Sequence, residues 1–231
     1  MEGIDLLMRH IYLFPVVGTV LGIIFGLSAF LLLQIFPMPI VAALLLIIIY
    51  KLCGINHLDG LADFGDGVTA HGPVEKKISA MKDTALGTGG ALFIMILLFL
   101  VFATLSSMPE RLMPLALVVA EVSAKQSMIA FAAFSKPLHK GFGQIAIENA
   151  SGHDFFAGFL IALPICAAVL GAAGLAMLIA AQLSALYMIA LSKRNFGGST
   201  GDGFGATNEI GRAVALIVSL MLWEVNPWMP W

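Results

Sequence analysis

Three aspartates that follow an apolar run have the spacing of one helix face. The segment 56–67 reads Asn-His-Leu-Asp-Gly-Leu-Ala-Asp-Phe-Gly-Asp-Gly, and Asp59, Asp63 and Asp66 stand at positions i, i+4 and i+7. At about 100° per residue, these offsets fall within roughly 60° of each other on a helix. Carboxylates stacked in this way repel one another unless a cation lies among them, and hard oxygen ligands suit Mg²⁺ or Mn²⁺. The spacing therefore predicts a divalent-cation site.

An amphipathic helix whose acidic face simply meets water is the alternative for this segment. Against it, the residues between the aspartates are mostly apolar, and the segment directly follows an apolar run. Carboxylates at membrane depth are costly and normally line a functional cavity. Gly60 leaves the flank of the acidic face without a side chain, which allows close approach of a second helix or a phosphate group. His57, two residues before Asp59, is a candidate ligand or general base.

Two further polar segments carry groups of related chemistry. Asp83 is suited to complete a metal shell, and Lys82 is a cation within reach of a phosphate. Five glycines within 197–205 free the backbone to curl around an anion and present its N–H groups, with a flexible turn as the alternative. Thr200 and Asp202 add a hydroxyl and a carboxylate there. Because no Gly-Lys-Ser/Thr follows, a nucleotide-hydrolase loop is excluded.

One acidic and one basic residue lie inside an apolar run. Glu121 and Lys125 are four positions apart, in the order that favours an ion pair within one helix. Mutual neutralisation of two costly charges and a functional role both explain such a pair, and the sequence leaves the two open.

These residues belong to a chain that is too apolar for a soluble protein. Of its 231 residues 60% are apolar and 11% charged, against about 45–50% and about 25% in soluble domains. Mean hydropathy is +0.98. A net charge of -2 excludes a nucleic-acid binder, and two cysteines exclude a disulfide scaffold. A span needs about 20 apolar residues, so we expect an all-α polytopic bundle of about six or seven spans, with residues 1–231 as one domain.

The apolar runs place these spans. They are predicted at 14–34, 39–55, 88–108, 112–134, 156–172, 174–191 and 210–225. The long run 160–191 is divided at the turn residues Gly171 and Gly174, because ten of the twelve basic residues then lie on one side of the membrane. Those ten are Arg9, Lys51, Lys76, Lys77, Lys82, Lys136, Lys140, Lys193, Arg194 and Arg212.

The side that carries these basic residues is predicted to be cytoplasmic, because loops rich in Lys and Arg stay inside. The chain is then a multi-pass protein of the cell membrane with its active site at the cytoplasmic face. Trp223, Trp228 and Trp231 fall at the outer end of the last span, where indoles anchor at the interface.

The polar motifs, in their order and spacing, resemble the cobalamin synthase family, the adenosylcobinamide-GDP ribazoletransferases. The motifs that carry the resemblance are His57-Leu58-Asp59-Gly60-Leu61-Ala62-Asp63 with Asp66, Met81-Lys82-Asp83 with Gly87, and Gly197-Gly198-Ser199-Thr200-Gly201-Asp202 with Gly205-Ala206. The resemblance covers about residues 12–212. The chain departs from it at Lys125, where many members have an arginine, and in lacking the amino-terminal Thr-Arg-Xaa-Pro stretch of bacterial members.

The resemblance implies an inner-membrane enzyme of cobamide assembly. Such an enzyme joins adenosylcobinamide-GDP to the ribose 3′-hydroxyl of α-ribazole or its 5′-phosphate, releases GMP and requires Mg²⁺. We expect the metal ligands to be Asp59, Asp63, Asp66 and Asp83. We expect the catalytic residues to be His57, Lys82 and Asp202, with His57 or a metal-free aspartate as the general base. We expect substrate contacts from Gly197, Gly198, Thr200, Gly201, Gly205 and Lys125.

Two other functions are weaker matches. A CDP-alcohol phosphotransferase of phospholipid synthesis also uses membrane aspartates, but its Asp-Gly-Xaa-Xaa-Ala-Arg pattern is not met after Asp59-Gly60. A secondary transporter is disfavoured because the acids cluster at one side rather than at the midplane, and no inverted repeat is visible. The expected partners are the two small-molecule substrates and membrane lipid, without nucleic acid. The lower-ligand base and the oligomeric state, a homo-oligomer included, are left open.

Overall fold

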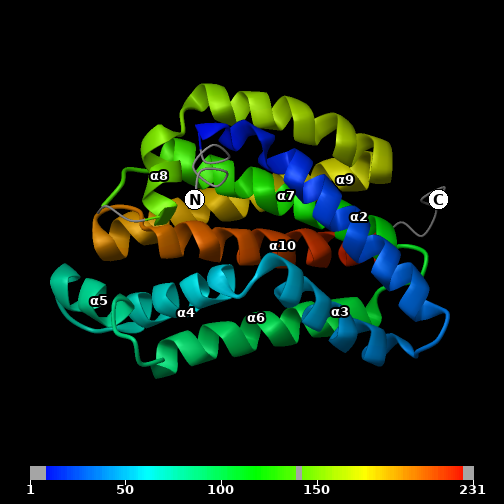
Figure 1. Cartoon of the computed structure of the whole chain (residues 1–231), viewed down its shortest axis with the longest axis horizontal. Helices are drawn as coiled ribbons and strands as arrows, with labels where there is room; N and C mark the ends of the chain where they lie inside the picture. The colour runs from blue at the N-terminus through cyan, green and yellow to red at the C-terminus, as the bar shows by residue number, and fades with distance from the viewer. Residues whose placement is uncertain (1–8, 139–141, 226–231) are drawn as a thin grey trace.

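The chain folds into a bundle of helices. A computed structural model describes residues 9–138 and 142–225, without the side chains of 142–145 (Figure 1). After a short 3-10 turn, η1 (Ile11–Leu13), the helices are α2 (Phe14–Leu33), α3 (Met38–Cys53), α4 (Asn56–Thr69), α5 (Val74–Met81), α6 (Thr88–Ser107), α7 (Met113–Phe134), α8 (Phe142–Asn149), α9 (Gly152–Phe196) and α10 (Gly201–Val225). Among the residues that the structure describes, the only β pairing is an isolated bridge between Pro137 and Ser199. The predicted all-α class is confirmed.

Five of the described helices are long and apolar enough to cross a membrane. They are α2 with η1, α6, α7, α9 and α10, and a bent pair, α3 and α4, adds a sixth crossing if it is counted as one span. Because proteins span bilayers with apolar helices of about this length, the chain is a polytopic membrane protein.

Helix α9, with 45 residues, is two arms rather than one rod. Its backbone leaves helical geometry at Leu170 and at Gly171, where φ is +53°. That left-handed region favours glycine. Gly174 then lies so close to the first arm that a Cβ atom on it would be 2.0 Å from the carbonyl oxygen of Cys166. Figure 1 shows the arms running back along each other, so the predicted division of this run is confirmed.

Helix α7 is the centre of the bundle, with 89% of its most apolar stretch buried. Gly18, Gly22 and Gly26 recur every fourth residue along α2, and a Cβ atom on each would come within 2.6–2.7 Å of the backbone of α7. Small residues at this period let two membrane helices approach closely. By contrast, Leu27 on α2 and Phe99 on α6 are 59% and 70% exposed and form part of the apolar outer surface that suits lipid.

The sequence suggests that the acidic segment continues the preceding span, but the structure has a sharp turn between the two. Helix α3 ends at Cys53, Gly54 adopts a positive φ of +73°, and α4 leaves at an angle of 96°. Helix α4 then lies between α6 and α10 (Figure 1). The turn at Gly54 therefore brings the three aspartates against helices from two other parts of the chain.

The polar elements gather at one end of the bundle. Figure 1 places α5, α8, the end of α4 and the starts of α6 and α10 there, while the bend of α9 lies at the opposite end. The prediction that Arg212 belongs to the basic residues at the borders of the loops is wrong, because Arg212 is buried within α10. Lys140, Trp228 and Trp231 lie outside the described residues.

Candidate active site

Four carboxylates from two helices meet near the polar end of the bundle. Asp63 interacts electrostatically with Asp59 and Asp66 of its own helix and with Asp202 in the first turn of α10. Gly60 permits this meeting, since a Cβ atom on it would lie 3.0 Å from the carbonyl oxygen of Asp202. The predicted close approach of a second helix at Gly60 is therefore confirmed, and it adds Asp202 to the acidic face. We call Asp59, Asp63, Asp66 and Asp202 the acidic cluster.

Most of the negative charge in the acidic cluster is not neutralised by the protein. Among the described residues, the carboxylates of Asp59 and Asp63 have no hydrogen-bond or ion-pair partner. Asp59 is exposed and Asp63 half-buried. The cation that interacts with Asp202 is Lys82, which is exposed on the segment after α5. Like charges held together in this way attract a cation from solution.

Asp66 has a structural role that its spacing does not predict. Its two carboxylate oxygens accept hydrogen bonds from the backbone N–H groups of Gly87 and Gly90, each at 2.8 Å. These N–H groups begin α6 and have no partner within their own helix. A carboxylate is favoured at this positive end of a helix. Asp66 thus fastens α6 to α4 while it faces the other aspartates.

Asp83 is not brought into the acidic cluster. It lies exposed on the segment that joins α5 to α6, and its carboxylate accepts a hydrogen bond of 3.0 Å from the N–H of Ala85. The electrostatic contacts that join Asp63 and Asp202 to their neighbours do not include it. Its predicted place in a metal shell has no contact in the structure to support it.

The glycine-rich segment is a shorter turn than expected. Gly197 ends α9 with a positive φ of +80°, and a Cβ atom on Gly198 would lie 3.0 Å from the carbonyl oxygen of Lys136. Thr200 is buried, and its hydroxyl accepts a hydrogen bond of 3.2 Å from the N–H of Gly203. This is the contact of a helix N-cap, so α10 begins at 201 instead of the predicted 210.

The glycines after this cap belong to a helix rather than to an open anion-binding loop. Gly201 begins α10, and Gly205 lies one turn further on. A Cβ atom on Gly205 would be 3.2 Å from the Cα of His57. The expected open loop is wrong from Gly201 on, because these residues are helical and Gly203 and Gly205 allow α10 to pack closely against α7 and α4. Binding of an anion by this segment stays a prediction. The N-terminus of α10 nevertheless lies beside the acidic cluster.

Lys125 and Glu121 do not form the predicted ion pair within α7. Lys125 donates a hydrogen bond of 2.6 Å from Nζ to Oδ1 of Asn208. Glu121 forms a salt bridge with the Nε group of Arg212 from α10. The planar fork of an arginine matches a carboxylate better than an ammonium does, so the pairing runs between helices.

These residues belong to a buried network within the bundle. Arg212 also bonds Glu209 at 2.7 Å, and Glu209 accepts further hydrogen bonds of 2.9 Å from the Tyr50 hydroxyl and from the Asn208 amide. Glu121, Glu209 and Arg212 are each at most 2% exposed. We call Tyr50, Glu121, Asn208, Glu209 and Arg212 the buried network. Its sequence signal is weak: charged residues placed inside apolar runs.

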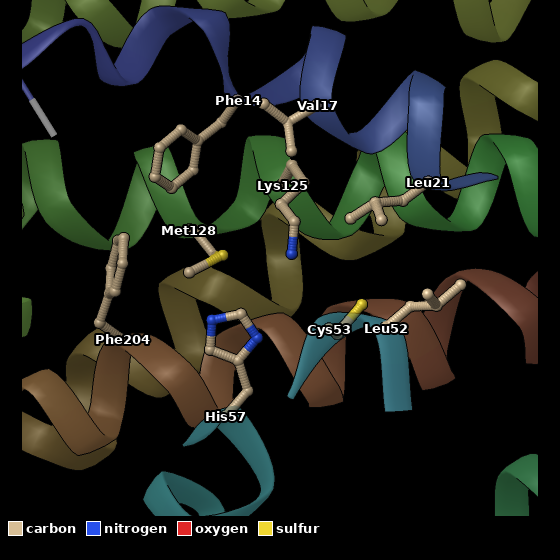
Figure 2. Close-up of a pocket in the computed structure, with 9 residues that line it drawn as sticks. All are labelled: Phe14, Val17, Leu21, Leu52, Cys53, His57, Lys125, Met128 and Phe204. Atoms are coloured by element: carbon tan, nitrogen blue, oxygen red, sulfur yellow. The ribbon is translucent and has the colours of Figure 1, made fainter. Parts of the chain in front are cut away.

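A cavity of about 360 Å³ is lined by residues of α2, α3, α4, α7 and α10, among them Lys125, which bonds Asn208 of the buried network. Figure 2 shows His57 from α4 and Lys125 from α7 pointing toward one another across it, with Phe14 and Phe204 on one flank. Nδ1 of His57 is buried and has no hydrogen-bond partner among the described residues. His57 therefore faces this cavity, two residues away from the first aspartate.

Comparison with known proteins identifies the family. A model of the family described as cobalamin-5-phosphate synthase matches residues 4–220. The chain belongs to this family. Three relatives named adenosylcobinamide-GDP ribazoletransferase come from Methanosarcina mazei, Methanosarcina barkeri and Pyrococcus abyssi, and are 44%, 43% and 37% identical. The aligned parts cover 94%, 98% and 91% of this chain, and 84%, 87% and 87% of the respective relatives. No solved structure matches the fold.

The membership confirms the resemblance that the polar motifs indicate. The matched range of the cobalamin-5-phosphate synthase family contains α4, α7 and most of α10. It therefore takes in the acidic cluster, the cavity and the buried network together.

Proposed function

We propose that the chain transfers the adenosylcobinamide-phosphate group of adenosylcobinamide-GDP to the 3′-hydroxyl of α-ribazole, or of its 5′-phosphate, and releases GMP. The name shared by the relatives supports the reaction. The observation that carries it in this chain is the acidic cluster, where four carboxylates meet with Lys82 close by. Such a site suits a diphosphate that arrives with a divalent cation.

Transfer between phosphate esters requires alignment and neutralisation of charge more than covalent help from the protein. The 3′-hydroxyl oxygen forms a bond to the phosphorus that bears the cobinamide arm, and the bond from that phosphorus to the GMP oxygen breaks. Lys82 is placed to attract the negative charge of the phosphoryl oxygens. The N-terminus of α10 adds the positive end of a helix dipole beside the acidic cluster.

The residues of the acidic cluster fit a Mg²⁺ ion that is bound partly by the protein and partly by the substrate phosphates and water. Among the described residues, no three His, Cys, Asp or Glu side chains converge closely enough to hold a metal by themselves. Mg²⁺ is usually bound by one or two carboxylates together with substrate phosphates and water. Asp59, Asp63 and Asp202 are the oxygen donors for this arrangement, because Asp66 is already bonded to α6. When bound there, Mg²⁺ would neutralise charge on the diphosphate.

The proton of the 3′-hydroxyl needs an acceptor close to the reacting phosphorus. Asp59 and Asp63 have oxygens without protein partners, so one that does not bind the cation can accept it. His57 is the other candidate from the sequence, but its ring lines the cavity, and the charged groups that interact with it are Lys125, Glu209 and Arg212. We therefore assign the proton to a carboxylate of the acidic cluster and a binding role to His57.

We propose that the polar end of the bundle faces the cytoplasm. Lys76, Lys77 and Lys82 lie at this end, on or next to α5, and Lys193 and Arg194 lie at the end of α9. Loops rich in Lys and Arg remain on the cytoplasmic side. In this orientation the site opens to the compartment that holds nucleotide substrates.

Purified protein in detergent, mixed with adenosylcobinamide-GDP and α-ribazole, tests the proposed reaction by the release of GMP. We expect GMP and the joined corrinoid in equal amounts, and neither when one substrate is omitted. A parallel mixture of CDP-diacylglycerol with a soluble alcohol should release no CMP. Absence of GMP from the complete mixture, or release of CMP from the parallel one, overturns the proposal.

A further inference from the structure

The cavity between α2, the end of α3, the start of α4, α7 and the start of α10 has no part in the phosphate chemistry above. Its lining is mostly apolar, and Phe14 and Phe204 form an aromatic pair in it, with ring centroids 6.2 Å apart and planes tilted by 52°. Two polar groups face the same space, the ring of His57 and the ammonium of Lys125 (Figure 2). An apolar pocket with a few convergent polar groups is the usual form of a small-molecule site.

We propose that this cavity binds the flat heteroaromatic base of the acceptor nucleoside. The inference rests on the proposed function, in which the acceptor nucleoside carries such a base; the donor carries guanine and adenine, and the test below separates the two substrates. It adds the location of the base and the residues that select it.

The size of the cavity favours a single small ring system. At about 360 Å³ it lies near the lower end of the range of about 300–1,000 Å³ for small-molecule sites. A corrin macrocycle with its side chains is too large for it. One fused aromatic base fills such a space and gains contact with Phe14 and Phe204, since aromatic rings favour offset or edge-on packing with one another.

The polar groups of the cavity match a base that carries a ring nitrogen. Lys125 gives one hydrogen bond to Asn208 and keeps two further N–H donors for a ligand. Its charge also favours the face of an aromatic ring. Nδ1 of His57 is buried without a partner, and a ring nitrogen of the base supplies one.

The position of the cavity joins it to the reacting groups. His57 is two residues before Asp59 on α4, and Phe204 is two residues after Asp202 on α10. Two residues correspond to about 3 Å along a helix axis. Because side chains two residues apart point to opposite sides of a helix, the ribose of a base held between His57 and Phe204 has to extend past α4 or α10 to bring its 3′-hydroxyl to the carboxylates.

A lipid chain is a poorer occupant of this space. An acyl chain would leave the ammonium of Lys125 with a single partner, and His57 with none at Nδ1, in an apolar environment. Buried polar groups without hydrogen bonds cost about 1–3 kcal/mol each. A heteroaromatic base gives Nδ1 of His57 an acceptor, offers the face of its ring to the ammonium of Lys125, and fills the apolar part as well.

Val17→Trp tests the proposal, because Val17 lines the cavity and a larger side chain occupies it. Val20→Trp, on the same helix but 54% exposed on the outer surface, is the matched control. GMP release is measured against the concentration of each substrate. We expect Val17→Trp to raise the KM for α-ribazole by roughly tenfold or more, in the range that pocket contacts supply. The KM for adenosylcobinamide-GDP should stay unchanged, and Val20→Trp should alter neither value.

An acceptor without a base separates this effect from general damage. Methyl α-ribofuranoside offers the ribose hydroxyls alone, and we expect its poor KM to be the same in wild type and Val17→Trp. An increase for both acceptors, an increase for adenosylcobinamide-GDP instead, or no change for α-ribazole overturns the inference. Loss of a co-purified lipid from Val17→Trp with an unchanged KM for α-ribazole identifies a lipid site and overturns it too.

Failure of the proposed function gives a different result, because the wild type then releases no GMP from these substrates at all. If Val17→Trp does not fold, Met128→Ala replaces it. Met128 also lines the cavity, and its truncation removes contact area without inserting bulk. We expect the same selective rise in the KM for α-ribazole, and equal KM values in variant and wild type contradict the inference.

Discussion

The acidic cluster and the buried network treat charge in opposite ways, although both use α10. Asp202 and Arg212 are ten residues apart on that helix. Around Arg212, Glu121 and Glu209 satisfy the guanidinium, and Tyr50 and Asn208 satisfy Glu209. Around Asp202, carboxylates of like charge come together, and among the described residues the cation that interacts with Asp202 is Lys82.

The contrast separates charge that holds the bundle together from charge that is kept for a ligand. Inside the membrane an unpaired ion is expensive, so the protein supplies every partner of the buried network. At the polar end, water lowers that cost, and Asp59 and Asp63 have no hydrogen-bond or ion-pair partner in the part of the chain that the structure describes. Carboxylates without a positive partner therefore indicate the ligand site, and carboxylates paired with Arg212 indicate a structural role.

Removal of the central cation of the buried network should have the largest effect on stability. Arg212→Met leaves Glu121 and Glu209 buried and unpaired, at a cost of about 3–5 kcal/mol. We expect a large drop in the melting temperature in detergent, or loss of folded protein. Arg194→Met removes an exposed arginine at the end of α9 and should melt like the wild type. Equal melting of the two variants would show that the network does not stabilise the bundle.

Removal of one charge from the acidic cluster should reverse this pattern, with a loss of activity and not of stability. For Asp59→Asn we expect GMP release to fall by about 100-fold or more, the size seen when one preorganised electrostatic group is removed. The melting temperature should not decrease, because like-charge repulsion is relieved. Glu75→Gln, which changes an exposed carboxylate on α5, is the control. Near-normal turnover in Asp59→Asn removes the basis for a ligand role.

Asp66 combines the two roles, because it is part of the acidic cluster and its carboxylate also bonds the start of α6. Asp66→Ala removes the acceptor of two N–H groups that begin α6, and we expect a loss of about 1–2 kcal/mol in the free energy of unfolding. Asp83→Ala, which removes a single exposed turn contact, should change it by less than about 0.5 kcal/mol. The two variants are compared by chemical unfolding in detergent. Equal losses would mean that the bonds to α6 carry no stability.

The smallest effect is expected at the edge of the buried network. Tyr50→Phe removes one hydrogen bond to Glu209 and should lower stability by about 1 kcal/mol without a change in GMP release. Tyr187→Phe alters a tyrosine that is 65% exposed on α9 and should be neutral. A fall in GMP release in Tyr50→Phe at unchanged stability would show that the buried network takes part in catalysis and would contradict its purely structural role.

The spans and the acidic helix face could be predicted because their signals are local. Apart from the start of α10, apolar runs located the membrane helices to within a few residues, and the placement of basic residues divided α9 close to Gly171. The i, i+4, i+7 spacing indicated that Asp59, Asp63 and Asp66 share a face, as their electrostatic contacts confirm. The apolar runs and the aspartate spacing use residues within one span or one turn of each other, whereas the division of α9 also uses the basic residues along the whole chain.

Contacts between distant segments could not be predicted in the same way. The pairing of Glu121 with Arg212 depends on how α7 packs against α10, and local spacing pointed to Lys125 instead. The early start of α10 depends on the buried N-cap of Thr200, which a glycine-rich composition conceals. The cavity between His57 and Lys125 arises only when five helices meet, so no pattern in the chain indicates it.

The central claim, that the acidic cluster holds a divalent cation with a diphosphate, is tested most directly by the dependence of GMP release on Mg²⁺. Purified protein is freed of metal with a chelator and assayed with both substrates as Mg²⁺ is returned. We predict no GMP above background in the metal-free sample and full recovery with Mg²⁺, but no recovery in Asp59→Asn at the concentration that saturates the wild type. Undiminished GMP release after removal of the metal would contradict the claim.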